Sequence, residues 1–326
     1  MEAALLERQR VWRDPGAPGR TLVPFTVQGS SRAADHTGFE IPEYGLLLDA
    51  GLPTRRQPRA VIITHTHTDH CGNLPRICMG TTDTFNVFCP EQAVEPLQNM
   101  LAATACLRAC SMRLVWNSAL FTGQIVSLAP ADGDQPLCTM YERGQTPSRQ
   151  PDPAKRRKTF QPGEFHPNTP AVCKKLFVRA VPLKHSIATN GYIISEERKG
   201  LKPEYKGKTQ ADLDAMRKEG VDLNCTRLVP MLAFLCDCTS DSAVEMIRML
   251  RDAPPRVIMV ECTYIDDADT EQAVSRKHVL WSRIRDATQE LPNVVFLLIH
   301  FSNRYHEGTR LADWAKTLPP NVHAFL

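Results

Sequence analysis

The sequence predicts an α/β fold in which helices pack outside the sheet layer or layers. Several short runs are apolar along most of their length, at Ala60–Ile63, Phe177–Leu183, Leu232–Cys236, Val257–Val260 and Val294–Ile299. Such runs are typical of strands that are covered on both faces. An alternation of these strands with helices therefore implies that the helices form the outer cover.

The remaining elements are expected in the following order. Early strands precede the first apolar run, at about Thr21–Val27 and Tyr44–Asp49. Helices are expected at about Glu91–Ala109, Gln210–Glu219, Asp241–Asp252 and Thr270–Glu290. In the second of these helices, Leu213 and Met216 fall on one face, as a helical period requires.

Each apolar run leads into a potential metal ligand. After Thr64, the first run meets His65-Thr66-His67-Thr68-Asp69-His70, and the later runs lead to His185, Asp237, Glu261 and His300. Strand ends are where α/β folds place their active sites, and imidazole with carboxylate suits Zn²⁺. The alternatives are a histidine-rich turn, a chance metal binder, and ordinary capping or core polar residues at the single positions.

The motifs around these ligands point to a known family. They are His65–His70, a His185–Tyr192 segment, Glu261–Tyr264 with a later His278, and Ile299–Tyr305, which contains His-Phe-Ser-Asn-Arg-Tyr. Together they resemble the metallo-β-lactamase superfamily and, within it, the tRNase Z family of tRNA 3′-processing endonucleases, over roughly residues 20 to 326. The segments Leu201–Gly207 and Thr239–Asp241 resemble the short, plant-type subgroup.

The resemblance implies one αββα-sandwich domain over residues 1–326, two zinc ions, a precursor tRNA substrate and a homodimer. His65, His67 and His185 would hold the first zinc, Asp69, His70 and His300 the second, and Asp237 would bridge them. Asp69 would also orient the attacking water.

The resemblance also suggests roles outside the ligand set. Glu261 and His278 would form a proton shuttle, in which His278 protonates the leaving ribose oxygen and Glu261 orients it. Ser302, Arg304 and Tyr305 would contact the RNA. The alternatives are that His278 is an ordinary polar residue of a helix and that Arg304 forms a structural ion pair.

The chain departs from the family pattern at several positions. Asp237 lies between Cys236 and Cys238, which we interpret as packing residues, although a thiolate could compete for a soft metal. Val260 occupies the position of a family histidine, and Leu52–Arg55 replaces a Glu-Gly-Thr-Gln segment. No Gly/Pro-rich arm is evident between His185 and Asp237, so either the arm is short or tRNA is held differently.

A separate feature is an insertion at about 131–170, rich in Pro, Gly, Gln and charged residues. This composition predicts a mobile loop. Its Lys155-Arg156-Arg157-Lys158 cluster could contact phosphate or act as a nuclear-import signal, or it could simply be a solvated charged loop.

Composition sets the outer limits. The 326 residues are 42% hydrophobic with a net charge of +3, so an RNA-binding surface would need locally concentrated charge. Eleven cysteines form no regular framework, which favours reduced thiols and a cytosolic or nuclear location, with an organelle left open. No apolar stretch approaches the roughly 20 residues of a membrane span, and the first residues lack the apolar core of a secretory signal.

These observations predict a zinc-dependent endoribonuclease that cleaves the 3′ trailers of precursor tRNA. Two alternatives stay open. One is another hydrolase of the superfamily, of the phosphodiesterase, sulfatase or thioesterase type. The other is an inactive RNA-binding homologue, which the intact ligand set disfavours.

Overall fold

The structure is a computed structural model that describes residues 10–13, 25–54, 57–79, 86–109, 124–136, 176–305 and 309–326. Most of the insertion expected at about 131–170, including its basic cluster, lies outside these residues. Its first part, through Pro136, ends in a short strand. Within the described parts of the chain, no helix is both long and apolar enough to cross a membrane.

The first half of the chain forms a seven-stranded sheet in the order β1 to β7. The strands are β1 (Arg10–Arg13), β2 (Thr26–Arg32), β3 (His36–Ile41), β4 (Leu46–Leu48), β5 (Ala60–Ile62), β6 (Asn86–Cys89) and β7 (Gln124–Ser127). The pairs from β1 to β4 are antiparallel, and those from β4 to β7 are parallel.

The second half repeats this pattern in a second seven-stranded sheet, in the order β14 to β8. Its strands are β8 (Gln135–Pro136), β9 (Leu176–Leu183), β10 (Thr189–Leu201), β11 (Asn224–Leu235), β12 (Val257–Glu261), β13 (Val295–Ile299) and β14 (Val322–Ala324). Pairs from β8 to β11 are antiparallel, and those from β11 to β14 are parallel. The two halves therefore share one topology, although the sequence shows no internal repeat.

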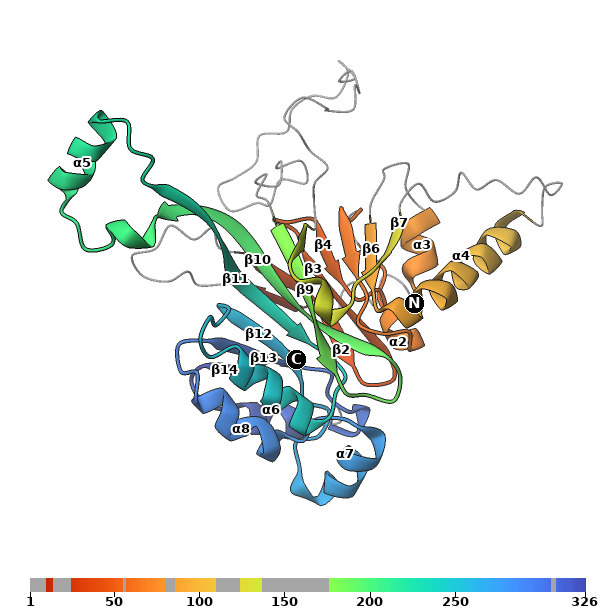
Figure 1. Cartoon of the computed structure of the whole chain (residues 1–326). Helices are drawn as coiled ribbons and strands as arrows, with labels where there is room; N and C mark the ends of the chain where they lie inside the picture. Colours follow the sequence, from red (N-terminus) through yellow and green to blue (C-terminus); the bar gives the residue numbers. More distant parts are fainter. Residues whose placement is uncertain are drawn as a thin grey trace, which may run out of the picture.

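Helices cover the outer face of each sheet (Figure 1). The first sheet packs against α2 (Thr68–Cys71), α3 (Leu74–Met79), η1 (Glu91–Ala93) and α4 (Val94–Ala109). The second packs against α6 (Ser240–Met249), α8 (Trp281–Gln289) and α9 (Arg310–Ala315). Shorter or peripheral helices are η3 (Pro130–Asp132), η4 (Pro203–Tyr205), α5 (Gln210–Lys218), η5 (Asp267–Asp269), α7 (Thr270–Arg276) and η6 (Asn303–Tyr305). The predicted αββα sandwich is confirmed.

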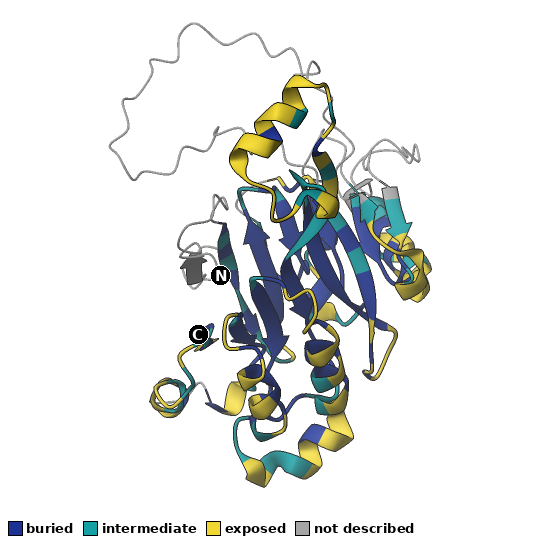
Figure 2. Ribbon diagram, turned by 60° about the vertical axis from the view of Figure 1, so that its left-hand side comes forward, coloured by how far each residue is buried: buried dark blue, intermediate teal, exposed yellow. Residues whose placement is uncertain are grey.

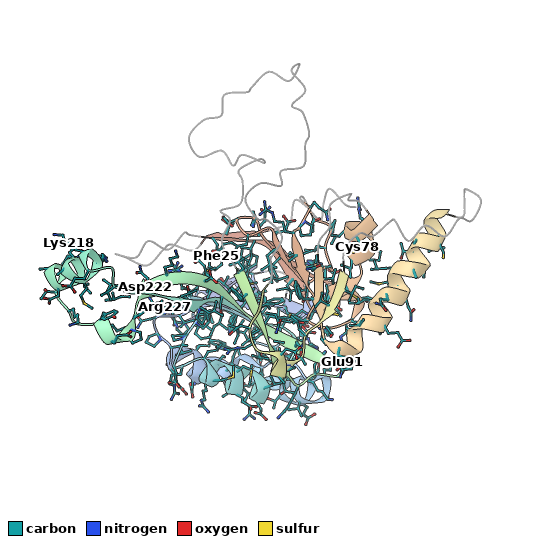
Figure 3. The ribbon with its side chains drawn as sticks, turned by 45° about the horizontal axis from the view of Figure 1, so that its top comes forward. Phe25, Cys78, Glu91, Lys218, Asp222 and Arg227 are labelled. Carbon is teal, nitrogen blue, oxygen red and sulfur yellow. The ribbon has the colours of Figure 1, made fainter. Side chains whose placement is uncertain are left out.

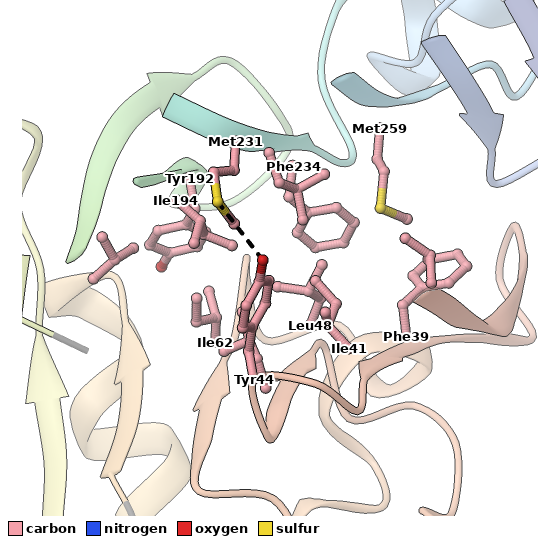
Figure 4. Packing of buried hydrophobic residues seen from close by; sticks show 14 of the residues in the cluster. Phe39, Ile41, Tyr44, Leu48, Ile62, Tyr192, Ile194, Met231, Phe234 and Met259 are labelled. Atoms are coloured by element: carbon pink, nitrogen blue, oxygen red, sulfur yellow. Dashed lines mark hydrogen bonds between the residues drawn. The ribbon is translucent and has the colours of Figure 1, made fainter. Parts of the chain in front are cut away.

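Alternation along the strands explains why both sheet faces are buried (Figure 2). In β4, Leu46 and Leu48 point into the core between the sheets, whereas Leu47 packs under the outer helices. Between the sheets, Phe39 packs edge-on against Phe234, with ring centroids 6.2 Å apart, and Tyr44 donates a hydrogen bond to the Met231 sulfur at 3.7 Å (Figure 4). Side chains from the two sheets thus build one shared core.

The strands β10 and β11 continue beyond the sandwich as a protruding arm, residues 195–229, with α5 at its tip (Figures 1 and 3). Along β11, the outer half from Asn224 is exposed or half-buried, and burial is complete only from Met231 onward. At the tip, Leu213 and Leu223 are buried. The chain therefore has an arm, built from a strand pair and a helix rather than from Gly/Pro-rich sequence.

Two of the expected elements differ from the structure. The helix expected at Thr270–Glu290 is wrong as a single helix, because α7 ends at Arg276 and α8 begins only at Trp281. The break falls at Lys277, which adopts left-handed backbone angles. The early strand expected at Thr21–Val27 is shifted, since β2 begins at Thr26, and residues 21–24 lie outside the described residues.

Candidate active site

The first ligand segment, His65–His70, follows β5 and is fixed by neighbours from both sheets. Tyr192 of the second sheet donates a hydrogen bond to the Ile63 carbonyl at 2.8 Å, and Asn190 N–H donates to the Thr64 carbonyl at 3.1 Å. Asp49, at the end of β4, accepts from Thr64 N–H at 2.7 Å. The loop is thus held before any metal arrives.

Asp237 lies at the centre of the ligand cluster. Its Oδ2 lies 3.6 Å from His65 Nε2 and 3.7 Å from His185 Nε2. Its Oδ1 faces the opposite pair, 3.5 Å from His70 Nε2 and 3.3 Å from His300 Nε2. One carboxylate therefore faces two groups of potential ligands, which is the position that a bridging residue would occupy.

The remaining ligands complete the two groups. His67 Nδ1 lies 2.9 Å from His65 Nε2, and the potential ligand atoms of His65, His67, His185 and Asp237 all lie within 4.8 Å of one another. Asp69 Oδ2 lies 3.4 Å from His70 Nε2 and 3.6 Å from His300 Nε2. The structure thus brings together all seven residues that the sequence predicts as ligands.

The donor set fits zinc. Buried Nε2 atoms of His70, His185 and His300 have no hydrogen-bond partner among the described residues. Their Nδ1 atoms are engaged, by Asp49 at 2.8 Å, the Lys277 carbonyl at 3.1 Å and Thr263 Oγ1 at 3.1 Å, respectively. Two ligand atoms on one tetrahedral zinc lie roughly 3.3–3.4 Å apart, and the Nε2-to-carboxylate distances of 3.3–3.7 Å are close to this spacing.

Protonation differs among the histidines of the cluster: burial opposes a charge on His70, but the Asp237 and Asp49 carboxylates outweigh it and raise its pKa. Burial lowers the pKa of both His65 and His185, so each imidazole stays neutral, which is the form that ligates. For Asp69, burial alone would raise the pKa, but the His300 and His70 imidazoles, whose Nε2 atoms lie 3.6 and 3.4 Å from its Oδ2, outweigh burial and hold the pKa below its usual range. The neighbouring imidazoles do the same for Asp237, despite its burial.

The cysteines beside Asp237 behave as packing residues. Burial, reinforced by nearby carboxylates, raises the pKa of both the Cys236 and Cys238 thiols. Cys236 donates its S–H to Asp237 Oδ1 at 3.2 Å. A protonated thiol is a poor ligand because the thiolate is the form that binds metal.

Glu261 and His278 form a pair beside the ligand cluster. The carboxylate is fully buried and accepts from His278 Nδ1 at 2.9 Å, Thr263 Oγ1 at 2.6 Å, Cys238 N–H at 2.7 Å and Val279 N–H at 3.1 Å. Burial opposes a charge on His278, but the charge and hydrogen bond of Glu261 prevail and raise its pKa to about 9.

The position of His278 rules out an ordinary helical surface residue. It lies in the break between α7 and α8, and its ring centroid is 5.0 Å from that of His185 and 5.5 Å from that of His300. The helix break thus turns this side chain into the site.

Ser302, Arg304 and Tyr305 follow His300 at the rim. Ser302 is half-buried, and its N–H donates to the Thr263 carbonyl at 3.0 Å. Arg304 forms an ion pair with Asp269, which also accepts a hydrogen bond from the Tyr305 hydroxyl. Tyr305 is buried. The structure therefore shows the ion pair for Arg304 that was weighed as the alternative to RNA contact.

Sequence reasoning gave no role to several residues that support the site. Asp49, Thr263 and Lys277 orient the ligand histidines, as described above. Asp49 was visible as a polar residue ending the short strand Leu46–Leu48. Three residues at strand ends, Asp49, Asp237 and His300, have positive φ angles of 55°, 48° and 63°. Such angles are uncommon outside glycine and cluster at functional sites.

Three matches to known proteins are found at the level of sequence. The family model for the metallo-beta-lactamase superfamily matches residues 37–79. The chain is 24% identical over 296 residues to the chloroplastic tRNase Z TRZ2 of Arabidopsis thaliana, covering 88% of this chain and 70% of the relative. It is 32% identical over 149 residues to tRNase Z TRZ1 of the same plant, covering 45% of this chain and about half (52%) of the relative.

Among solved structures, human tRNase Z, short form (ELAC1), matches with a TM-score of 0.43 and 15% identity, covering 96% of this chain and 95% of that one. The two mixed sheets, the outer helices and the ligand-bearing strand ends define a metallo-β-lactamase-fold protein. Within that superfamily, both relatives to which the sequence is similar are tRNases Z, at 24% identity over 88% of this chain and at 32% identity over 45% of it.

Proposed function

We propose that the protein is a zinc-dependent endoribonuclease that removes 3′ trailers from precursor tRNA. The observation that carries the proposal is the Glu261–His278 pair beside a complete set of ligands for two metals. A ligand set alone would suit many hydrolases of the superfamily. A buried carboxylate that orients a histidine into the site adds the general acid that an alkoxide leaving group needs. The relatives named above are themselves tRNases Z.

Under this proposal, His65, His67 and His185 would hold one zinc, Asp69, His70 and His300 would hold the other, and Asp237 would be shared by both groups. Two zinc ions supply Lewis-acid chemistry: they activate water and offset the charge that develops on the phosphate. Asp69, whose pKa lies below its usual range, stays ionised and accepts a hydrogen bond from the attacking water as well as binding metal.

The chain itself supplies the proton for the leaving group. Because Nδ1 of His278 is hydrogen-bonded to Glu261, Nε2 is the atom left to donate to the ribose 3′-oxygen. Glu261 keeps the imidazole in this orientation and favours its protonated form. Cleavage then leaves a 3′-hydroxyl on the tRNA.

RNA would be held along the surface leading away from this site. Ser302 remains a predicted RNA contact at the rim, whereas the Arg304 guanidinium and the Tyr305 hydroxyl, which were predicted as contacts too, are engaged by Asp269. The protruding arm carries exposed basic residues, among them Lys206, Lys208 and Lys218, that could meet RNA phosphates. A homodimer, and a cytosolic, nuclear or organellar location, remain predictions as well.

The proposal is tested by replacing the proton donor. We expect that His278→Ala keeps both zinc ions but slows cleavage of precursor tRNA by about 10²–10⁴-fold, the usual contribution of a general acid. The matched control is His323→Ala, an exposed histidine of β14, which should cleave like the wild type. Unchanged cleavage by His278→Ala would remove His278 from the mechanism.

A further inference from the structure

Helix α7, which leads to His278, has little apolar packing of its own. In α7 only Ala273 is buried, and Val274 is 73% exposed. Ala273 joins only a small apolar cluster with Tyr264 and Leu280, whereas Ile265 before α7 and Val279 after it pack on the large core of the second sheet. Because burial of apolar surface is what usually fixes a helix on a domain, another interaction must hold α7 in place.

That interaction comes from the two residues that follow the last ligand strand. The Arg304 guanidinium donates to an Asp269 carboxylate oxygen and, at 2.5 Å, to Gln272 Oε1, while its Cζ lies 5.4 Å from the centre of the Tyr264 ring. The Tyr305 hydroxyl donates to the second carboxylate oxygen of Asp269. Both oxygens of Asp269, at the start of α7, are therefore occupied.

This anchor is more than a surface ion pair. Asp269 is 12% exposed and Arg304 is 37% exposed, so both are partly shielded from water. Arg310 lies over the outer side of the Tyr305 ring, 5.2 Å from its centre, and donates to Asp266 at 2.5 Å. The planar guanidinium of Arg304 meets two acceptors and a ring face at once, which lysine cannot reproduce.

The anchor is connected to His278 through one short helix. Two turns after Asp269, Lys277 ends α7 with left-handed angles, and His278 N–H donates to the Ala273 carbonyl at 2.9 Å. The Lys277 carbonyl accepts from His185 Nδ1 at 3.1 Å, and Lys277 Nζ donates to the His185 carbonyl at 3.3 Å. The position of α7 therefore fixes the His278 backbone from one side, while Val279, buried in the core and donating its N–H to Glu261 at 3.1 Å, fixes it from the other.

We propose that Arg304 and Tyr305, acting through Asp269, are positioning residues that hold α7 so that His278 remains aligned on Glu261. This inference rests on the proposed function, in which His278 is the general acid. It gives the Arg-Tyr pair of the His300–Tyr305 motif a role in proton delivery.

The role has a chemical signature that general damage to the fold lacks. A ribose alkoxide needs a proton to depart, whereas p-nitrophenolate is a good leaving group that departs without one. Misplacing His278 should therefore slow cleavage of precursor tRNA but spare hydrolysis of bis(p-nitrophenyl) phosphate. Loss of metal or of the fold would slow both reactions.

The experiment compares Arg304→Ala and Tyr305→Phe with the matched control Arg285→Ala, an exposed arginine that pairs with the neighbouring Asp286. For each full-length, zinc-loaded protein, we would measure zinc content, both cleavage rates, and amide hydrogen exchange in the peptide 266–280. We expect Arg304→Ala to keep two zincs, to exchange about tenfold faster in this peptide, and to cut precursor tRNA at least about tenfold more slowly. Hydrolysis of the nitrophenyl ester should stay near the wild-type rate.

A double-mutant cycle tests whether Arg304 acts through Asp269. If Arg304 acts through Asp269, the double variant Arg304→Ala/Asp269→Ala should be no slower than the slower of the two single variants. Arg304→Lys, which keeps the charge but cannot span both acceptors, should recover only part of the rate.

Three results would overturn the proposal: unchanged exchange in residues 266–280, equal slowing of both substrates, or additive effects in the cycle. Failure of the proposed function would look different. The wild type would then hydrolyse the nitrophenyl ester without cutting precursor tRNA, and the exchange measurement would still decide whether Arg304 and Tyr305 hold α7.

Discussion

Replacing Gly51 with alanine should disrupt the second metal group, which consists of Asp69, His70 and His300, without replacing any of these residues. An alanine Cβ here would lie 1.7 Å from the Asp69 carbonyl oxygen, 2.6 Å from its carbonyl carbon and 2.7 Å from Thr37 N. Since Cβ contacts below 3.0 Å essentially do not occur, the backbones at positions 51 and 69 would have to separate by at least 1.3 Å, the difference between 3.0 and 1.7 Å. Metal–ligand distances tolerate only about 0.2 Å.

We therefore expect Gly51→Ala to retain the zinc held by His65, His67 and His185 and to lose the other. Its affinity at the second group should fall by at least about 10–100-fold, as when supporting residues of metal sites are removed. Overpacking should also cost about 1–3 kcal/mol of stability. The assay is zinc content after dialysis against a competing chelator, with circular dichroism to verify folding.

The matched control is Gly200→Ala in β10, where an added Cβ would meet only the flexible Arg227 side chain, at 3.3 Å or more. This variant should bind two zincs like the wild type. If folded Gly51→Ala also holds two zincs with unchanged affinity, the close approach of Gly51 to Asp69 does not control the second metal group.

Three further predictions concern other parts of the molecule. Tyr192→Phe removes the donor to the buried Ile63 carbonyl and should lower the free energy of unfolding by about 1–3 kcal/mol in urea titrations; an unchanged midpoint would contradict this. Burial raises the pKa of the Cys78 and Cys89 thiols to about 12, so in the folded protein they stay protonated as pH rises through 9, and iodoacetamide should label them only after unfolding. Native labelling of either cysteine at pH 9 would show that its thiol is accessible. Removing metal with 1,10-phenanthroline should abolish RNA cleavage, and added Zn²⁺ should restore it; cleavage that survives in verified metal-free protein would contradict a zinc mechanism.

That the candidate ligands would lie close together could be predicted from sequence because of how parallel strands meet. Strands β11, β12 and β13 are parallel neighbours, so Asp237, Glu261 and His300, at or just beyond their ends, necessarily share one sheet edge. Their apolar runs are long enough to recognise without any alignment. Asp49 likewise follows a short apolar strand and so lies at a strand end. Its role in orienting His70 depends on a contact that the sequence does not reveal.

The break that delivers His278 could not be predicted in the same way. Neither glycine nor proline marks it, since a lysine, Lys277, takes the left-handed position at the end of α7. The sequence from Thr270 onward therefore predicts one continuous helix. The left-handed turn is held by tertiary contacts, from Lys277 to His185 and from His278 to Glu261.

The strand pair that forms the arm could not be predicted from sequence either. The outer parts of β10 and β11 are held together by backbone pairing, from Glu196 opposite Val229 to Leu201 opposite Asn224. With little apolar surface to bury there, these segments lack the apolar run that marks a strand. Sequence patterns report burial, so an element that projects into solvent leaves a weak signal.

The central claim is tested most directly by cleavage of an end-labelled precursor tRNA with zinc-loaded protein, with both product ends mapped and His65→Ala as the comparison. His65 is buried and faces Asp237, so its loss should remove a zinc. The account predicts a single cut next to the discriminator nucleotide, leaving a 3′-hydroxyl on the tRNA, and no cut by His65→Ala. Wild-type protein that carries two zincs and leaves the precursor intact would contradict the tRNA-processing function.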